Sequence, residues 1–481
     1  MTIDKLPDNA LLEIFHFYKD DNIDYFTFAW GWVMLMQVCR RWRQVVLGSP
    51  RRLNLRLVCT RTTPVTRLLD IWPPFPITVW LPPTLPAVDK NGVENIIAAF
   101  ECRDRISNIV IYYIRGPELK TLVNLLCEPL PVLTRFYLHS SDESVPVLPE
   151  TFLGGSAPRL QSFQLTGIPF PSFPKFILHF THIVLLLLSD IPKSGYISPE
   201  VMATSLTALP HLKLLSIGFR SPPSGLLQLS PPHLTRVTLP ALSYLIFSGA
   251  SEYFEDFVAR IDTPRLTSLK ITFFMDLIFD IPRLRNFINH TEGLKPFNQA
   301  AIEFSNWMIR IVFGPGSPPQ FEFKLEIRCE RLDWQLSSMT QIFSEQLPLL
   351  SYVEQLELRE FRGEGFEWKD DPDMDSAQWL ELFRLFVTAQ SLHVSERLVS
   401  PVARALQDLT EQTATEVLPV LGTLFLEGLQ PSGPGHEAMK PFDTARQLSQ
   451  QPVRIQRWER PRSEPWLTKK TEVQQQLQDE T

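Results

Sequence analysis

The sequence lacks the features that define membrane, secreted and disulfide-bonded proteins. Its longest apolar run, Ile183 to Leu188, is far shorter than the roughly 20 residues of a membrane-spanning helix. The N-terminal residues include acids and form no basic-then-apolar leader, so they give no indication of secretion. The five cysteines are odd in number and widely separated. They favour reduced thiols in a cytoplasmic or nuclear protein over a disulfide framework or a zinc site.

Catalytic motifs are also missing. The sequence has no glycine-rich phosphate loop of the right spacing, no GxSxG and no HExxH. His179 and His182 have no nearby cysteine or acid to complete a metal-ligand set, so we interpret them as packed or edge histidines. We therefore expect a binding protein that needs no metal and no cofactor. An enzyme is the less favoured alternative, because catalytic groups from distant positions can meet in a fold.

A strong overall charge is absent too. The net charge of −7 gives no general attraction to nucleic acid or to an anionic membrane. One segment differs, because Arg40 to Arg67 contains eight arginines and no acid. A nucleic-acid groove would explain it, but no glycine-rich aromatic platform accompanies the arginines. We favour solvated faces and docking to an acidic protein, with no nucleic-acid partner. The acidic run Asp370 to Asp375 lacks the ligand spacing of a calcium loop and is interpreted as a solvated helix cap.

A leucine pattern recurs along the chain. The unit Leu-x-x-Leu-x-Leu, or a near equivalent, starts at residues 106, 133, 160, 183, 212, 242 and 266. The intervals of 27, 27, 23, 29, 30 and 24 residues lie near the range of roughly 20–29 residues typical of leucine-rich repeats. In such repeats the apolar side chains of each short strand point inward and stack on the next repeat. The 42 prolines, spread along the chain, also indicate many short elements.

The predicted fold is α/β. We expect a leucine-rich-repeat solenoid over residues 101–430, a curved horseshoe with parallel strands on the concave side and helices on the convex side. A β-hairpin interlude near residues 300–330 interrupts the repeats, with Gly314 to Gly316 as a turn. The repeat pattern resumes at residues 353–358, 389–394 and 421–426. Helices are predicted at residues 117–126, 199–209, 251–261, 333–347, 376–389 and 401–417.

Two further regions are predicted on either side of this solenoid. Residues 58–100 are expected to form a proline-rich junction whose first strand covers Ile77 to Leu81. Residues 431–481 are expected to contain a linker at 431–435, one last strand at Val453 to Trp458, and a loose polar tail.

The first 57 residues are predicted to form a separate helical module. Leu11, Leu12, Ile14 and Phe15 follow one another at helical spacing, and a second apolar stripe includes Val38, Cys39 and Trp42. So short a segment has too few residues to bury these stripes against itself. We therefore expect another surface to cover them.

These residues carry a resemblance. Leu6-Pro7, Leu11-Leu12, Ile14-Phe15 and then Val38 to Trp42 resemble the F-box, and residues 49–57 and 71–74 are similar to the large F-box family of mushroom-forming fungi. The resemblance implies docking on the Skp adaptor, and through it on a cullin, in a ubiquitin ligase. The residues that it implies for this docking are Leu6, Pro7, Leu11, Leu12, Ile14, Phe15, Val38, Cys39 and Trp42. A helical hairpin that only caps the solenoid is the simpler alternative, and the aromatic insertion at Tyr25 to Val33 keeps it open.

The expected function is that of a substrate-recognition subunit. The F-box would bind the Skp adaptor, and the concave strands would bind an unknown target protein. The polar positions between the repeat leucines are the candidates for target contact, namely Tyr137, Gln164, Thr166, Ser216, Lys270, Thr272, Glu357 and Arg359. Their mixed chemistry specifies no particular target. A leucine-rich-repeat scaffold that recruits no ubiquitin ligase is the alternative.

Overall fold

The computed structural model describes most of the chain. The described residues are 6–20, 31–48, 55–61, 64–72, 74–81, 90–221, 236–274, 280–294, 297–314, 322–329, 332–344, 348–361, 376–407, 409–410, 413–429 and 433–460. The chain divides into two compact units. Unit 1 contains residues 1–197 and 208–212, and unit 2 contains residues 198–207 and 213–481.

Unit 1 begins with a helical module. Its helices are α1 (Asp8–Asp20), α2 (Gly31–Val38) and α3 (Arg40–Leu47). The Arg41 guanidinium binds the Asp8 carboxylate, with Nη2 2.8 Å from Oδ1, and so ties α3 to the start of α1. Cys39 begins α3 as an N-cap, because its Sγ accepts the Trp42 N–H at 3.4 Å. The predicted helical module is therefore present as three short helices.

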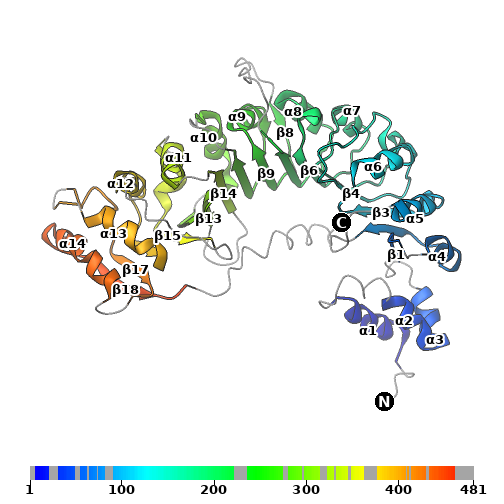
Figure 1. Ribbon diagram of the computed structural model, residues 1–481, viewed down its shortest axis with the longest axis horizontal. Coiled ribbons are helices and arrows are strands. Elements are labelled where there is room, and N and C mark those ends of the chain that lie inside the picture. The colour runs from blue at the N-terminus through cyan, green and yellow to red at the C-terminus, as the bar shows by residue number, and fades with distance from the viewer. Residues whose placement is uncertain are drawn as a thin grey trace. The chain divides into compact units, whose positions relative to one another are not determined.

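The rest of unit 1 is a parallel sheet with helices on one face (Figure 1). The strands follow chain order and are β1 (Leu55–Val58), β2 (Ile77–Leu81), β3 (Ile106–Ile111), β4 (Arg135–His139), β5 (Ser162–Thr166) and β6 (Leu185–Ile191). The α-helices are α4 (Val65–Ile71), α5 (Lys90–Phe100), α6 (Gly116–Val123) and α7 (Phe173–Ile177). Short 3-10 turns add η3 (Arg103–Arg105), η4 (Leu125–Cys127), η5 (Phe152–Gly155) and η6 (Lys193–Gly195). We call the sheet face away from these helices the polar face.

The strand register explains the leucine pattern. Ile109, Phe136, Phe163 and Leu186 occupy one row across β3 to β6, and all four are fully buried. The predicted repeat strands are present, but most begin two residues later than the pattern suggested. Leu133, for example, precedes β4 and is buried in the turn before it. The predicted strand at 77–81 is confirmed as β2, and β1, which was not predicted, pairs with it in parallel.

Unit 2 repeats this arrangement, with its helices on one face of the sheet (Figure 1). The strands, in sheet order, are β7 (Leu214–Phe219), β9 (Tyr244–Gly249), β11 (Ser268–Phe273), β14 (Glu322–Arg328), β13 (Met308–Gly314), β12 (Gln299–Phe304), β15 (Gln355–Glu360), β16 (Ser391–Val394), β17 (Thr423–Glu427) and β18 (Arg454–Trp458). The α-helices are α8 (Pro199–Leu206), α9 (Ser251–Ala259), α10 (Pro282–His290), α11 (Leu332–Ser344), α12 (Ser376–Arg384), α13 (Val399–Gln407) and α14 (Pro434–Leu448). The 3-10 turns are η7 (Glu292–Leu294), η8 (Pro348–Tyr352) and η9 (Glu396–Leu398), and β8 (Val237–Thr238) and β10 (Ile261–Asp262) form a separate small sheet.

The predicted hairpin interlude is part of the main sheet of unit 2. Strand β13 runs antiparallel to both β12 and β14, while β14 pairs in parallel with β11 and β12 pairs in parallel with β15. The three strands therefore enter the sheet in reverse chain order. Because both outer strands keep the parallel direction, the interlude continues the repeat sheet. Of the predicted turn, Gly314 ends β13, and residues 315–320 lie outside the described residues.

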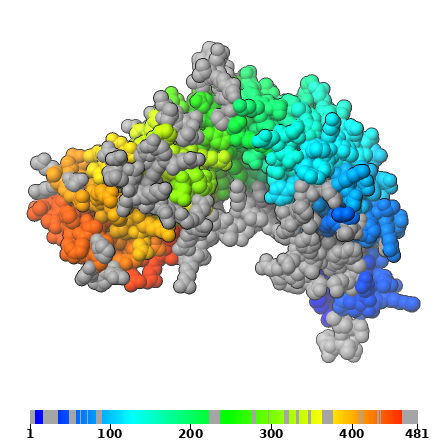
Figure 2. Space-filling view, viewed as in Figure 1, coloured from blue at the N-terminus to red at the C-terminus, as the bar shows by residue number. Residues whose placement is uncertain are grey.

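The region predicted as a linker and loose tail contains a helix that the sequence analysis missed. Helix α14 spans 15 residues although Pro441 lies inside it. Arg446 from this helix is fully buried and donates hydrogen bonds to the carbonyl oxygens of Ala414, Leu418 and Leu421 at 3.0–3.2 Å. The predicted last strand is confirmed as β18. In the space-filling view these C-terminal elements form one continuous surface of unit 2, and the predicted tail beyond residue 460 lies outside the described residues (Figure 2).

Candidate functional site

The apolar stripe of the N-terminal module divides into a buried part and an exposed part. Leu11, Phe15, Val45 and Val46 form the core of the module. Leu6, Leu12, Leu35, Met36 and Trp42 pack against that core while remaining partly exposed. The Phe15 and Trp42 rings meet with centroids 4.7 Å apart. The expectation that the module is too short to bury its stripes is therefore wrong for Leu11 and Phe15.

The exposed part of the stripe still lacks a cover among the described residues. Ile14 is 44% exposed and Val38 is 59% exposed. Pro7 and Cys39 are exposed as well. These positions come from α1 and from the end of α2, within the same small module. Exposed apolar side chains are available to pack against another protein, and single ones are also common on ordinary protein surfaces.

The polar face of unit 1 carries a row of aromatic rings. Tyr112 follows β3, and its ring centroid lies 4.5 Å from that of Tyr137 in β4. Tyr113 lies beside Tyr112, with centroids 6.5 Å apart, and 4.9 Å from His139. We call Tyr112, Tyr113, Tyr137 and His139 the tyrosine cluster. Of the predicted contact residues, Tyr137 is therefore the one that belongs to a ring cluster.

The surroundings of Tyr137 set its chemistry. Burial raises the pKa of its hydroxyl above the ordinary range, and the neighbouring Tyr112 adds to this rise, while a hydrogen bond from Thr166 opposes it. Tyr137 is therefore a neutral phenol at physiological pH. Gln164 lies opposite Tyr137 in the register and is buried, and its Nε2 donates to the Ser162 hydroxyl at 3.2 Å.

The polar face of unit 2 carries an ion-pair network instead. Glu303 of β12 lies at its centre and is buried. Its Oε2 binds Arg310 Nη1 of β13 at 2.7 Å, and its Oε1 binds Arg359 Nε of β15 at 2.8 Å. Arg359 also binds Glu357 at 3.2 Å. One carboxylate therefore holds the side chains of two neighbouring strands.

The network continues across β14 to β11. Glu326 binds Arg310 at 3.3 Å, pairs with Lys324, and accepts a hydrogen bond from the Thr272 hydroxyl at 3.3 Å. Lys270 binds Glu322 at 2.8 Å. Burial lowers the pKa of Lys324, and the adjacent Glu326 carboxylate opposes that change. The network contains four acids (Glu303, Glu322, Glu326 and Glu357) and four bases (Lys270, Lys324, Arg310 and Arg359), so its charges cancel.

Beyond the network, the His393 imidazole contacts two aromatic rings. The His393 ring stacks on Phe425 with centroids 4.3 Å apart, and it meets Trp458 edge-on at 5.1 Å. Burial lowers the pKa of His393 to about 4. This histidine is therefore neutral at physiological pH, and it supplies packing rather than charge.

The eight predicted contact residues differ in burial and in their neighbours. Gln164, Ser216 and Arg359 are buried, so they offer little surface to a target protein. Thr166 and Tyr137 are brought together, as are Lys270 and Thr272 with their partners in the network. The sequence analysis missed the rings Tyr112, Tyr113 and His139 and the network residues Glu303, Arg310 and Glu326. Alternation along the predicted strands could have found Glu303 and Arg310, because both occupy polar-face positions.

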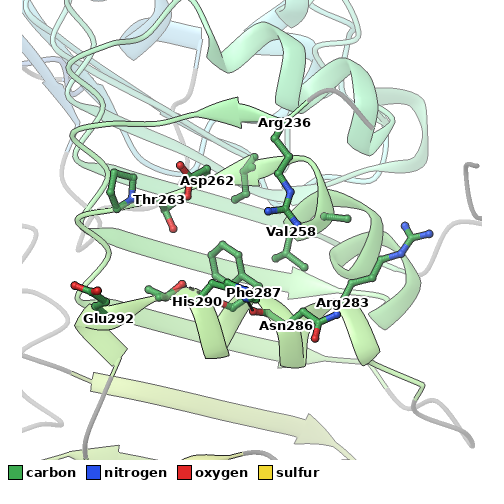
Figure 3. A pocket seen from close by; sticks show the side chains of 13 residues that line it. Arg236, Val258, Asp262, Thr263, Arg283, Asn286, Phe287, His290 and Glu292 are labelled. Carbon is green, nitrogen blue, oxygen red and sulfur yellow. Dashed lines mark hydrogen bonds between the residues drawn. The ribbon is translucent and has the colours of Figure 1, made fainter. Parts of the chain in front are cut away.

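A surface groove of about 530 Å³ lies between α9, β10 and α10 of unit 2 (Figure 3). Buried side chains at its base are Val258, Ile261 and Phe287, and its rim carries Arg236, Asp262, Asn286, His290 and Glu292. Beside the groove, the buried carboxylate of Glu255 accepts the N–H groups of Arg283 at 2.9 Å and Leu284 at 2.7 Å, which begin α10. Burial raises the pKa of Glu255 to about 7, against the effect of these two hydrogen bonds. The rim mixes both signs of charge and selects no single ligand.

Other sequence features can now be located. His179 and His182 are exposed, and the His182 ring stacks against that of His211 at 6.5 Å. The described part of the chain contains no group of three or more His, Cys, Asp and Glu side chains suited to a metal ion. None of its helices is long and apolar enough to cross a membrane.

Arg43, from the arginine-rich segment, donates a hydrogen bond to the Met36 carbonyl at 3.1 Å. The acidic run 370–375 and insertion residues 25–30 lie outside the described residues, and insertion residues 31–33 begin α2.

The architecture of each unit defines its class. Parallel strands in leucine-repeat register, with helices on one face, make an α/β fold of the leucine-rich-repeat type. No family model and no curated protein matches the sequence. Among solved structures, the leucine-rich repeat-containing protein LegL7 from Legionella pneumophila is similar over 83% of this chain and 98% of that one, at 12% identity and a TM-score of 0.27. The register and repeat spacing of this chain, rather than that match, define its fold.

Proposed function

We propose that this chain is a two-part adaptor of a ubiquitin ligase. The α1–α3 module would dock on the Skp adaptor, which in turn binds a cullin, and the polar faces of the sheets would bind a target protein. The observations that carry this proposal are the exposed apolar side chains of Ile14 and Val38 on a module whose core is already formed. The F-box resemblance of the same residues names the partner.

Binding, rather than catalysis, suits the described surfaces. The charged groups of the unit 2 network are paired with one another, and such pairs hold geometry rather than activate a nucleophile. The subunit would contribute proximity, because a bound target is held near the ubiquitin-loaded enzyme.

A second candidate is a scaffold that recruits no ligase. It is favoured by Leu11 and Phe15, which the resemblance assigns to docking but which form the core of the module. In that case the module is a self-contained helical unit with no adaptor.

The test is a pull-down of the full-length chain with recombinant Skp adaptor. The variant Val38→Asp places a charge on the exposed stripe and leaves the module core intact, so we expect adaptor binding to weaken at least about 10-fold. The matched control is Val420→Asp in unit 2, because Val420 is 52% exposed, close to the 59% of Val38. Circular dichroism of both variants reports on folding.

The outcomes separate the two candidates. Binding by the wild type and by Val420→Asp, but not by folded Val38→Asp, supports the adaptor proposal. Wild-type protein that does not bind the Skp adaptor overturns it and leaves the scaffold. Equal binding by all three proteins would show that the exposed stripe is not the docking surface.

A further inference from the structure

The tyrosine cluster has the composition of a cation-binding site. Aromatic faces attract ammonium and guanidinium groups electrostatically, and several rings around one point add their effects. The rings of Tyr112, Tyr113, Tyr137 and His139 lie within 4.5–6.5 Å of their neighbours in the cluster. Tyr113 is 38% exposed, so a ligand can reach the cluster from solvent.

Acidic side chains accompany the rings. The strands of unit 1 are parallel, so the segments after β3, β4 and β6 lie at the same edge of the sheet. Asp142 and Glu143 follow β4, and the exposed Asp190 lies near the end of β6. Ser189, which precedes Asp190, lies in one register row with Thr166 and His139, so Asp190 is two strands away from His139 on the same end of the sheet. The bases in the segments after these strands are Lys193 and Arg115, and Arg115 pairs with Glu118, so acids outnumber bases beside the rings.

Backbone strain marks the same place. Tyr113 has a φ of 57° and Asp190 a φ of 50°, both in the left-handed region that side chains other than glycine seldom adopt. Strain of this kind persists where the surrounding structure fixes it, and it is concentrated at binding sites. The Tyr113 ring lies 4.9 Å from that of His139 in this conformation.

We infer that the tyrosine cluster and Asp190 form a binding site for a basic side chain, lysine or arginine, of a protein partner. The inference rests on the proposed function, because it names the chemistry of the partner that the polar face of unit 1 would hold. The rings contact the cation, and Asp190 supplies the opposite charge. An anionic ligand is disfavoured, since the site offers π faces and carboxylates.

The test uses a small probe and needs neither adaptor nor target. Nα-acetyl-arginine methylamide is titrated into the full-length protein and followed by saturation-transfer NMR, with Nα-acetyl-citrulline methylamide as the neutral probe of the same shape. We expect the arginine probe to bind and the citrulline probe to bind about two- to five-fold more weakly or not at all. Equal binding of the two probes overturns the inference, as does binding of neither.

Matched variants locate the site. Tyr113→Asn removes one ring and keeps a residue that tolerates positive φ, so the fold is preserved and the dissociation constant for the arginine probe should rise about two- to five-fold. Asp190→Asn should raise it by a similar factor and reduce its dependence on salt. Tyr352→Asn, at an exposed tyrosine of unit 2, is the control. If Tyr113→Asn binds the probe as well as the control does, the site lies elsewhere.

Failure of this inference can be told apart from failure of the proposed function. Tyr113→Asn should leave the Skp pull-down unchanged, because the module and the tyrosine cluster share no residue. A chain that binds the arginine probe but not the Skp adaptor keeps the cation site and loses the ligase role. A chain that binds the adaptor but not the probe keeps the ligase role alone.

Discussion

The polar faces of the two units are built from different chemistry on the same backbone pattern. In unit 1 the positions between the core rows carry rings and amides, among them Tyr137 and Gln164, together with the base Arg135. In unit 2 the equivalent positions carry acids and bases that pair across five neighbouring strands. The rows that face the helices are apolar in both units. The repeat pattern therefore constrains one face of the sheet and leaves the other free to vary.

The two polar faces therefore differ in whether their side chains stabilise the fold or remain accessible to a partner. The unit 2 charges are partly buried and satisfy one another, so removing one leaves another unpaired in a poorly solvated place. The unit 1 rings contact one another through weak, additive interactions and remain accessible at Tyr113. We therefore expect substitutions on the unit 2 face to affect folding, and substitutions on the unit 1 face to affect binding.

The largest expected effect is that of Glu303→Ala. This change leaves Arg310 and Arg359 without the buried carboxylate that both of them bind. Breaking a buried pair from one side typically destabilises a protein by about 3–5 kcal/mol, and we expect a loss of that order in the free energy of unfolding. Urea unfolding followed by tryptophan fluorescence measures it. Glu354→Ala, at an exposed position before the neighbouring strand β15, serves as the control and should change little. Equal losses in both variants would contradict a structural role for the network.

The second expected effect is a pH dependence located in unit 2. The folded pKa of His393, about 4, lies below its ordinary value of 6.5. The stability that it contributes is therefore fully present above pH 6.5 and is lost as the pH falls towards 4, by on the order of 1 kcal/mol because solvent screens this partly exposed ring. His393→Phe keeps a ring against Phe425 and Trp458 and removes the titration. Its unfolding free energy should fall less than that of the wild type between pH 6.5 and 4, and parallel curves for the two proteins would refute this role.

Glu255 changes the free energy of unfolding with pH in the direction opposite to His393, and both effects are present in the wild-type curve. Its folded pKa of about 7 lies above its ordinary value of 4.5. Its contribution to stability is therefore fully present below pH 4.5 and is lost as the pH rises through 7. The comparison of His393→Phe with the wild type cancels this contribution, because both proteins retain Glu255.

The sequence could predict the core side of each unit but not its polar side. Leucine spacing located the strands because every repeat must bury the same three apolar positions. Leu356 in β15 and Leu392 in β16 are an example, since they pair in the register and are both buried. Glu303 and Arg359 are 56 residues apart and meet only because the interlude enters the sheet in reverse order. Helix α14 was missed because Pro434, Gly435 and Pro441 are typical of linkers, whereas buried Arg446 holds the helix to carbonyl oxygens of residues 414–421. Pairings at such distances leave no local signal.

The smallest expected effect distinguishes the two faces most directly. Tyr137→Phe removes the hydroxyl that is hydrogen-bonded to Thr166 and keeps the ring beside Tyr112. One hydrogen bond of this kind contributes about 1 kcal/mol, so the free energy of unfolding should fall by about that amount. The affinity for the arginine probe should not change, because the π face remains. Tyr352→Phe, at an exposed tyrosine, should change neither quantity. A loss from Tyr137→Phe as large as that from Glu303→Ala would show that the unit 1 face is also held by its polar groups. A loss of probe binding without a loss of stability would instead show that the cation is bound through the hydroxyl rather than through the ring.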